Sequence, residues 1–178
     1  MTVKVITMKL PRRKSPRLKN FDYSTPGYYF VTFCTHNRRR TLSHIVGAVH
    51  EPPETRLTEQ GKIVNDVIIN IPEHLGIKID KYVIMPNHIH MIMIIEHNEH
   101  LRAIRESPLH SRQIIEKAVG YIKMNSSKRI RKSISCEKIW QRSFHDHIIR
   151  GEKDYQKIWQ YINCNPMCWE NDCFYSEI

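Results

Sequence analysis

The chain has 178 residues, of which 40% are hydrophobic and 26% are charged, a balance typical of one soluble globular domain. It contains no apolar run long enough to cross a bilayer and no apolar N-terminal segment followed by small residues, so we expect a cytoplasmic location. The five cysteines include no Cys-x-x-Cys pair, and an odd count in a chain without a secretion signal argues against a disulfide framework. The net charge of +10 favours a polyanionic partner.

Basic side chains are clustered in a few segments of the chain. Residues 1–20 form a basic N-terminal arm without any acidic residue, and residues 21–178 are expected to form a single domain. This clustering favours nucleic acid as the partner over a solvated basic surface or an anionic membrane. The predicted DNA-binding residues are Arg12, Arg13, Lys14 and Arg17 in the arm, Arg38, Arg39 and Arg40 in a later loop, and Lys128 and Arg129 farther along the chain.

The first half of the chain predicts strands around one helix. Aromatic and β-branched residues from 28 to 35 indicate a strand, and residues 45–50 indicate a second, shorter one. Apolar residues recur at helical spacing between Thr58, which suits an N-cap, and Ile71, and Pro72 ends this helix. Residues 77–85 indicate another strand, and the turn at Pro86-Asn87 returns the chain as an antiparallel strand that ends at Ile95.

The second half of the chain predicts two helices separated by short strands. Residues 111–132 carry an apolar stripe at helical spacing, and residues 138–142 and 144–149 resemble short strands. A last helix covers residues 152–165 and ends at Pro166. This order of elements predicts an α+β domain with a ferredoxin-like antiparallel sheet and helices on one face.

Two histidines stand one residue apart at the start of the strand that begins at residue 88. Because strand side chains alternate between faces, His88 and His90 leave one face while Ile89, Met91 and Met93 leave the other. Neutral imidazoles are common metal ligands, so the pair can bind one divalent cation. Hydrogen-bonded histidines on an ordinary strand fit the same motif.

The last predicted helix offers one tyrosine beside its apolar stripe. Tyr161 lies to one side of that stripe, and Asn165 follows one helical turn later on the same side. Taken alone, the tyrosine also fits a half-buried helix aromatic, and the asparagine fits a residue that ends the helix before proline. The residues expected to face the core are Tyr155, Ile158, Trp159 and Ile162.

Several segments, in this order and spacing, resemble those of the REP-associated tyrosine transposases. The segments are Tyr23-Ser24-Thr25-Pro26-Gly27-Tyr28-Tyr29, Pro86-Asn87-His88-Ile89-His90, Ile139-Trp140-Gln141-Arg142-Ser143-Phe144-His145-Asp146-His147, and Tyr161-Ile162-Asn163-Cys164-Asn165-Pro166. The resemblance covers nearly the whole chain, from about Arg12 to about Trp169. This family is a single-tyrosine branch of the HUH endonuclease superfamily and is related to the transposases of small insertion sequences.

The resemblance implies that residues 21–178 form one HUH tyrosine transposase domain that cuts and rejoins single-stranded DNA beside hairpins. It implies Tyr161 as the nucleophile that forms a 5′-phosphotyrosine, and His88, His90 and Asn165 as ligands of a divalent metal ion, Mg or Mn. Related insertion-sequence enzymes carry glutamine at the position of Asn165. The resemblance leaves open whether the chain is a monomer or a homodimer.

Other roles and other functions also fit these residues. His145 and His147 are auxiliary candidates that would assist the tyrosine, contact DNA or close the core. A non-catalytic protein that binds hairpins or single strands would keep the fold and the basic surfaces. A metal-dependent hydrolase that uses water would need carboxylates near the histidine pair, for which Asp80 is the sequence candidate.

Overall fold

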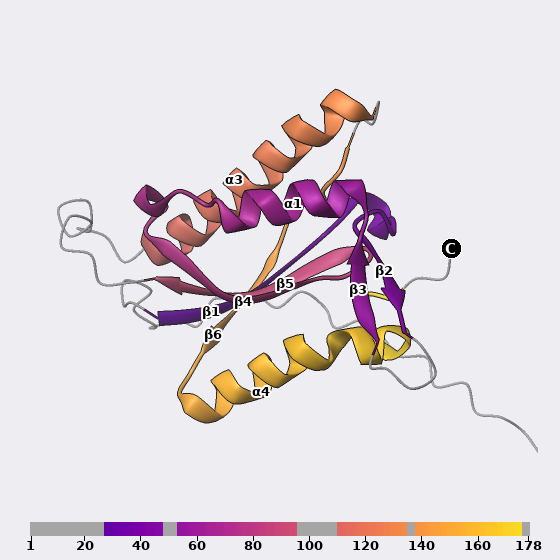
Figure 1. The fold of residues 1–178 in the computed structure, drawn as a ribbon. Coiled ribbons are helices and arrows are strands. Elements are labelled where there is room, and N and C mark those ends of the chain that lie inside the picture. The colour runs from indigo at the N-terminus through magenta and orange to yellow at the C-terminus, as the bar shows by residue number, and fades with distance from the viewer. Residues whose placement is uncertain (1–26, 48–52, 96–109, 135–137, 176–178) are drawn as a thin grey trace, which may run out of the picture.

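A four-stranded antiparallel sheet forms the centre of the fold (Figure 1). A computed structural model describes residues 27–47, 53–95, 110–134 and 138–175. The strands are β1 (Gly27–Cys34), β4 (Ile77–Ile84), β5 (His88–Ile95) and β6 (His145–Ile149), in the order β4-β5-β1-β6. With a helix between β1 and β4 and another between β5 and β6, this order is the predicted ferredoxin-like arrangement.

The strand that carries the histidines lies inside the sheet, between β4 and β1. In the β1–β5 register, Cys34 pairs with His88 and Thr32 pairs with His90. The β4–β5 hairpin is antiparallel, as predicted, with one irregularity between Ile79 and Lys81. A central position gives β5 hydrogen-bonded neighbours on both edges, so its side chains are held in fixed places.

Helices cover both faces of the sheet. The helices α1 (Glu59–Ile69) and α3 (His110–Ser133) lie on one face, and α4 (Glu152–Cys164) lies on the other (Figure 1). The expected α+β class and antiparallel sheet are confirmed, but the expectation that helices lie on one face differs from the structure at α4. The reason is that α4 covers the second apolar surface of the sheet, which would otherwise face water.

Alternation along β5 divides the core into two parts. Ile89, Met91 and Met93 are fully buried in the larger core under α1 and α3. Ile92 points the other way and joins Ile149 and Ile162 in a smaller core under α4. His88 and His90 share the parity of Ile92, so they point toward the α4 side, as the alternation predicts.

The start of α1 is held by a cap and by a close backbone contact. The Thr58 side chain accepts a hydrogen bond from the Gly61 backbone N–H at 3.1 Å, which confirms the predicted N-cap. Gly61 itself is buried, and a Cβ atom at this position would overlap the carbonyl oxygen of Leu42. Glycine is therefore required where the helix crosses this loop.

Several local details differ from the sequence predictions. A small second sheet pairs β2 (Ser43–Val46) with β3 (Glu54–Leu57), the latter not predicted, and residues 48–50 of the expected strand lie outside the described residues. Residues 138–142 contribute only one bridge, between Trp140 and Thr35. Trp159 is 38% exposed and not part of the core. None of the described helices is long and apolar enough to cross a membrane.

The chain does not leave the helical conformation at Pro166. Directly after α4 it continues as a 3₁₀ helix, η3 (Asn165–Asn171), with Pro166 near its start. Proline is tolerated in the first turn of a helix because its missing N–H has no partner there. The following residues, 172–175, return over the sheet toward the histidine pair.

Candidate active site

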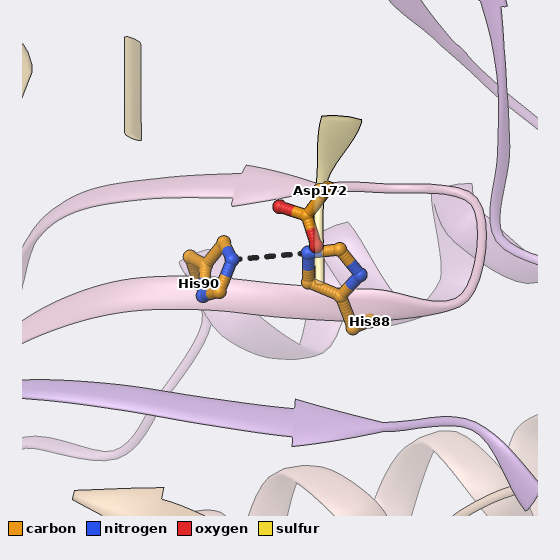
Figure 2. Close-up of side chains that lie close together, drawn as sticks. All are labelled: His88, His90 and Asp172. Carbon is orange, nitrogen blue, oxygen red and sulfur yellow. Dashed lines mark hydrogen bonds between the residues drawn. The ribbon is translucent and has the colours of Figure 1, made fainter. Parts of the chain in front are cut away.

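The two histidines of β5 meet through their ring nitrogens. Both side chains are buried, and the two Nε2 atoms lie 3.0 Å apart (Figure 2). Burial, together with the nearby Arg38 guanidinium, lowers the pKa of His88 to about 3. Burial also lowers the pKa of His90, with a further contribution from His88. Both rings are therefore neutral near pH 7, which is the form that binds metal ions.

Hydrogen bonds behind the pair orient both imidazoles. The Asn87 amide nitrogen donates to the Phe174 carbonyl at 2.8 Å, so its Oδ1 faces His88 and accepts a hydrogen bond from Nδ1 at 2.8 Å. His88 therefore carries its proton on Nδ1 and leaves the Nε2 lone pair free. His90 Nδ1 lies 2.7 Å from the Thr32 hydroxyl oxygen. Such outer partners are typical of histidines that bind metals.

A carboxylate from the end of the chain completes a three-residue cluster. Asp172 lies beside His88 and His90, and one ligand atom from each residue falls within 4.8 Å of the others (Figure 2). Asp172 was not predicted. Asp80, the carboxylate considered from the sequence, instead accepts a hydrogen bond from the Tyr155 hydroxyl at 2.6 Å.

Two features of these residues fit a bound divalent metal ion. The 3.0 Å between the Nε2 atoms equals the separation of adjacent ligands on an octahedral ion with bonds of about 2.1 Å. The buried Oδ1 of Asn165 has no hydrogen-bond partner among the described residues, while its amide nitrogen donates to Asp172 Oδ2 at 3.0 Å. A buried amide oxygen without a donor is costly unless a cation or water binds it. Imidazole nitrogens together with carboxylate and amide oxygens form a donor set that can hold a divalent metal ion.

Tyr161 reaches the same cluster from α4. Its hydroxyl oxygen lies 3.2 Å from His90 Nε2 and donates a hydrogen bond to Asp172 Oδ2 at 3.1 Å. Burial of the hydroxyl and the Asp172 carboxylate raise the pKa of Tyr161 well above its ordinary value. The residue is still 41% exposed, so a large substrate can reach it from outside. The tyrosine and the asparagine that helical spacing placed on one side therefore meet the histidine pair.

Residues 172–175 also cover the histidines. The Phe174 ring centroid lies 4.7 Å from that of His88 and 5.7 Å from that of His90. Arg38 holds this segment, because its guanidinium lies 5.4 Å from the Phe174 ring centroid and donates to the Cys173 carbonyl at 3.3 Å. The sequence offered no signal for this contact, since a short irregular segment has no periodicity.

The remaining predicted residues lie at different distances from the cluster. Arg39 is exposed, and Arg40 stacks on Trp169 and Tyr175, with its guanidinium 5.5 and 4.6 Å from the ring centroids. Lys128 and Arg129 are exposed on α3, where Arg129 forms an ion pair with Asp66. The predicted arm residues Arg12, Arg13, Lys14 and Arg17 lie outside the described residues.

The two auxiliary histidines lie on β6. His147 pairs with Asp154 at 3.0 Å, and His145 is exposed opposite Thr32 in the register. Neither belongs to the cluster of His88, His90 and Asp172. Their assistance to Tyr161 therefore stays a prediction from the sequence.

The chain is similar in sequence to known proteins. An uncharacterized protein of Haemophilus influenzae is 36% identical over 172 residues, covering 92% of this chain and 93% of that protein. The REP-associated tyrosine transposase of Escherichia coli is 26% identical over 145 residues, covering 82% of this chain and 69% of that protein. No protein-family model matches the chain.

A solved structure shows the same fold. The structure of a REP-associated tyrosine transposase bound to a REP hairpin superposes with a TM-score of 0.58 at 23% identity, covering 87% of this chain and 73% of that chain. The fold is thus that of a tyrosine transposase, and a helix tyrosine meets a histidine pair on its central sheet. In sequence and in fold, the chain is similar to the REP-associated tyrosine transposases over most of its length.

Proposed function

We propose that this protein is a DNA-processing enzyme that cuts and rejoins single strands beside hairpins, with Tyr161 as its nucleophile. The observation that carries this proposal is the 3.2 Å between the Tyr161 hydroxyl and His90 Nε2. A nucleophile must lie beside the groups that bind the reacting phosphate, and a cluster of this kind meets that requirement. The name of the Escherichia coli relative and the hairpin in the solved structure support this substrate class.

The proposed metal site consists of His88, His90 and Asn165, to which the structure adds Asp172. A bound Mg or Mn ion would reduce the negative charge that makes a phosphodiester resistant to attack. The outer hydrogen bonds from Asn87 and Thr32 keep the imidazoles in place for this role. Because the rings are buried, they need no rearrangement of solvent to present their lone pairs.

Tyr161 supplies the covalent step. Its hydroxyl oxygen attacks phosphorus, the bond from phosphorus to the 3′ oxygen breaks, and a 5′-phosphotyrosine forms. The phenol proton already lies on a hydrogen bond to Asp172 Oδ2, which can accept it as the new bond forms. The departing 3′ oxygen takes up a proton and becomes a hydroxyl. The covalent bond keeps the energy of the broken one, so attack by a 3′-hydroxyl can rejoin a strand without ATP.

The proposed DNA contacts are electrostatic. The arm residues Arg12, Arg13, Lys14 and Arg17, the loop Arg38–Arg40 and the α3 residues Lys128 and Arg129 would bind phosphates. Arg38 lies close enough to the cluster to lower the pKa of His88, so it can also reach a phosphate there. Such contacts position the strand, while reading a hairpin depends on its shape and unpaired bases.

The decisive test is a covalent adduct. Labelled single-stranded hairpins from the protein's own genomic neighbourhood are incubated with the protein and Mn, and the products are separated on a denaturing gel. We expect an adduct with the wild type and none with Tyr161→Phe, which removes one oxygen. Tyr155→Phe is the matched control on the same helix and should keep the adduct. An adduct on Tyr155, identified by mass spectrometry, would contradict the assignment.

A non-catalytic hairpin-binding protein is the second candidate. The observation that favours it is the Phe174 ring, which lies over both histidines. The same experiment separates the two functions, because a binding protein would retain the hairpin in a native gel and form no adduct under any metal condition.

A further inference from the structure

A cavity that Trp169 helps to line lies close to the histidine pair. Its volume is about 450 Å³, and its walls come from the loop at Arg40, from β2 and from η3. Pro86 and Pro166, which line it, directly adjoin Asn87 and Asn165 of the site. Trp169 belongs to both places, since its ring centroid is 5.9 Å from that of His88 and 5.5 Å from the Arg40 guanidinium.

The side chains around this cavity combine flat surfaces with polar groups. Trp169 and Tyr175 pack edge to face at 5.2 Å, and the Arg40 guanidinium lies over both rings. His44, Glu170 and Asn171 add hydrogen-bonding groups to the lining. Aromatic rings and guanidinium planes are the surfaces on which proteins stack unpaired bases, and a positive charge suits the attached phosphate.

We propose that this cavity binds one unpaired nucleotide of the DNA strand, adjacent to the phosphate that Tyr161 attacks. The proposal rests on the proposed function and adds a site for a base to it. A volume of about 450 Å³ lies within the usual range of small-molecule sites and has room for a base with its sugar. The base stacks on the Tyr175 and Arg40 surface, and the polar lining hydrogen-bonds its edge.

The position of the cavity explains why one nucleotide would bind there. Trp169 lines the cavity, and its ring centroid is 5.9 Å from that of His88, whose partner His90 packs against Tyr161. A strand that places its phosphate at the histidines can therefore place a neighbouring base in the cavity. Withdrawing that base from its neighbours costs stacking energy, which stacking on Tyr175 and Arg40 offsets.

The test uses cross-linking and needs no cleavage. Hairpin oligonucleotides with single-stranded flanks carry 5-iodouracil at one flank position at a time and are irradiated with the full-length Tyr161→Phe protein. We expect one position to cross-link with high yield to Trp169, Tyr175 or Met167, identified by mass spectrometry with fragmentation. Cross-links only to residues outside the cavity would overturn the proposal, as would a protein that binds no hairpin strand at all.

Affinity measurements provide a second, independent test. Replacing the base at the cross-linked position by an abasic site should weaken binding to the Tyr161→Phe protein about 10-fold. In proteins that also carry Arg40→Ala or Tyr175→Ala, the same replacement should have almost no effect, because the stacking surface is already removed. Arg56→Ala is the matched control. Arg56 is exposed on β3, the strand that pairs with β2, and it lies outside the cavity lining.

The outcomes distinguish this inference from the proposed function. An abasic effect of equal size in the Arg40→Ala and Arg56→Ala proteins would overturn the cavity as the base site, even if Tyr161 forms the covalent adduct. Conversely, cross-links at Tyr175 with no adduct in the active protein would support the cavity and contradict the cleavage activity.

Discussion

Tyr161 on α4 and His90 on β5 come within 3.2 Å of each other although 71 positions separate them in the chain. The contact exists because α4 packs on the face of the sheet toward which both histidines point. Asp172 accepts a hydrogen bond from the same tyrosine, so β5, α4 and the segment after η3 converge on one group of donor atoms.

The histidine pair should determine metal affinity. We expect His88→Ala or His90→Ala to weaken Mn binding more than about 100-fold in calorimetry, since each removes a direct ligand. Thr32→Val, which removes only the hydrogen bond behind His90, should weaken it about 10- to 100-fold. The controls are His145→Ala and His147→Ala on β6, which should leave affinity unchanged. Equal affinity in the wild type and His88→Ala would exclude the proposed site.

Metal binding should persist at mildly acidic pH. A solvated imidazole becomes protonated below about pH 6.5, whereas burial lowers the pKa of His88 to about 3. Mn affinity at pH 5 should therefore remain within a few-fold of its value at pH 7. Calorimetry in a non-coordinating buffer measures this directly, and a decline in affinity centred on pH 6.5 would show that the histidines are solvated.

The same pKa shift should make the metal-free protein less stable in acid. Between pH 6.5 and pH 3 the unfolded chain protonates His88 while the folded chain does not, so the unfolded form gains protons and stability falls as pH falls. Between pH 7 and pH 5, His88 should account for a decrease of about 2 kcal/mol in unfolding free energy. Urea denaturation in the presence of a chelator measures this decrease. His88→Ala should reduce the pH dependence of stability, and an unchanged dependence would contradict the burial of His88.

Two glycines in helices should respond to alanine in opposite directions. Gly61→Ala should destabilise the fold, because the added methyl group overlaps the Leu42 carbonyl where α1 crosses the loop. Gly120→Ala on α3 meets no atom within 4 Å and should stabilise the protein by about 0.5–1 kcal/mol. Thermal unfolding of both variants tests this contrast. If both variants shifted the unfolding temperature by similar amounts in the same direction, the close contact between Gly61 and the Leu42 carbonyl would be contradicted.

DNA binding should depend strongly on salt and on the basic arm. Deleting residues 1–19 should weaken hairpin binding and reduce the slope of log K against log salt by about 0.7 for each phosphate that the arm neutralises. Lys128→Ala on α3 should reduce the slope by the amount expected for a single phosphate. Lys62→Ala is the control, because Lys62 is exposed on α1 and paired with Glu59. Fluorescence anisotropy at several salt concentrations measures these slopes. An unchanged slope after deletion of residues 1–19 would show that the arm does not contact DNA phosphates.

The sequence by itself determined the local parts of this protein. Alternation along β5 placed His88 and His90 on one face, and helical spacing placed Asn165 one turn after Tyr161 on the same side of the last helix. Both inferences held because side-chain direction follows from the backbone geometry of a single strand or helix. The cap at Thr58 and the order of the helices and of the four strands of the main sheet were predictable for the same reason, whereas β3 was not predicted.

Only the tertiary structure decided which of these local features meet. The placement of α4 on the second face brings Tyr161 to His90, and the irregular segment after η3 brings Asp172 and Phe174 to the same place. Trp159 shows the limit of periodicity, since it shares the helical spacing of the core stripe yet is 38% exposed. Contacts between distant segments depend on how whole elements pack, and so does the burial that lowers the pKa of His88. No repeating pattern in the sequence encodes these contacts or the burial of His88, because both arise only when separate surfaces pack together and exclude water.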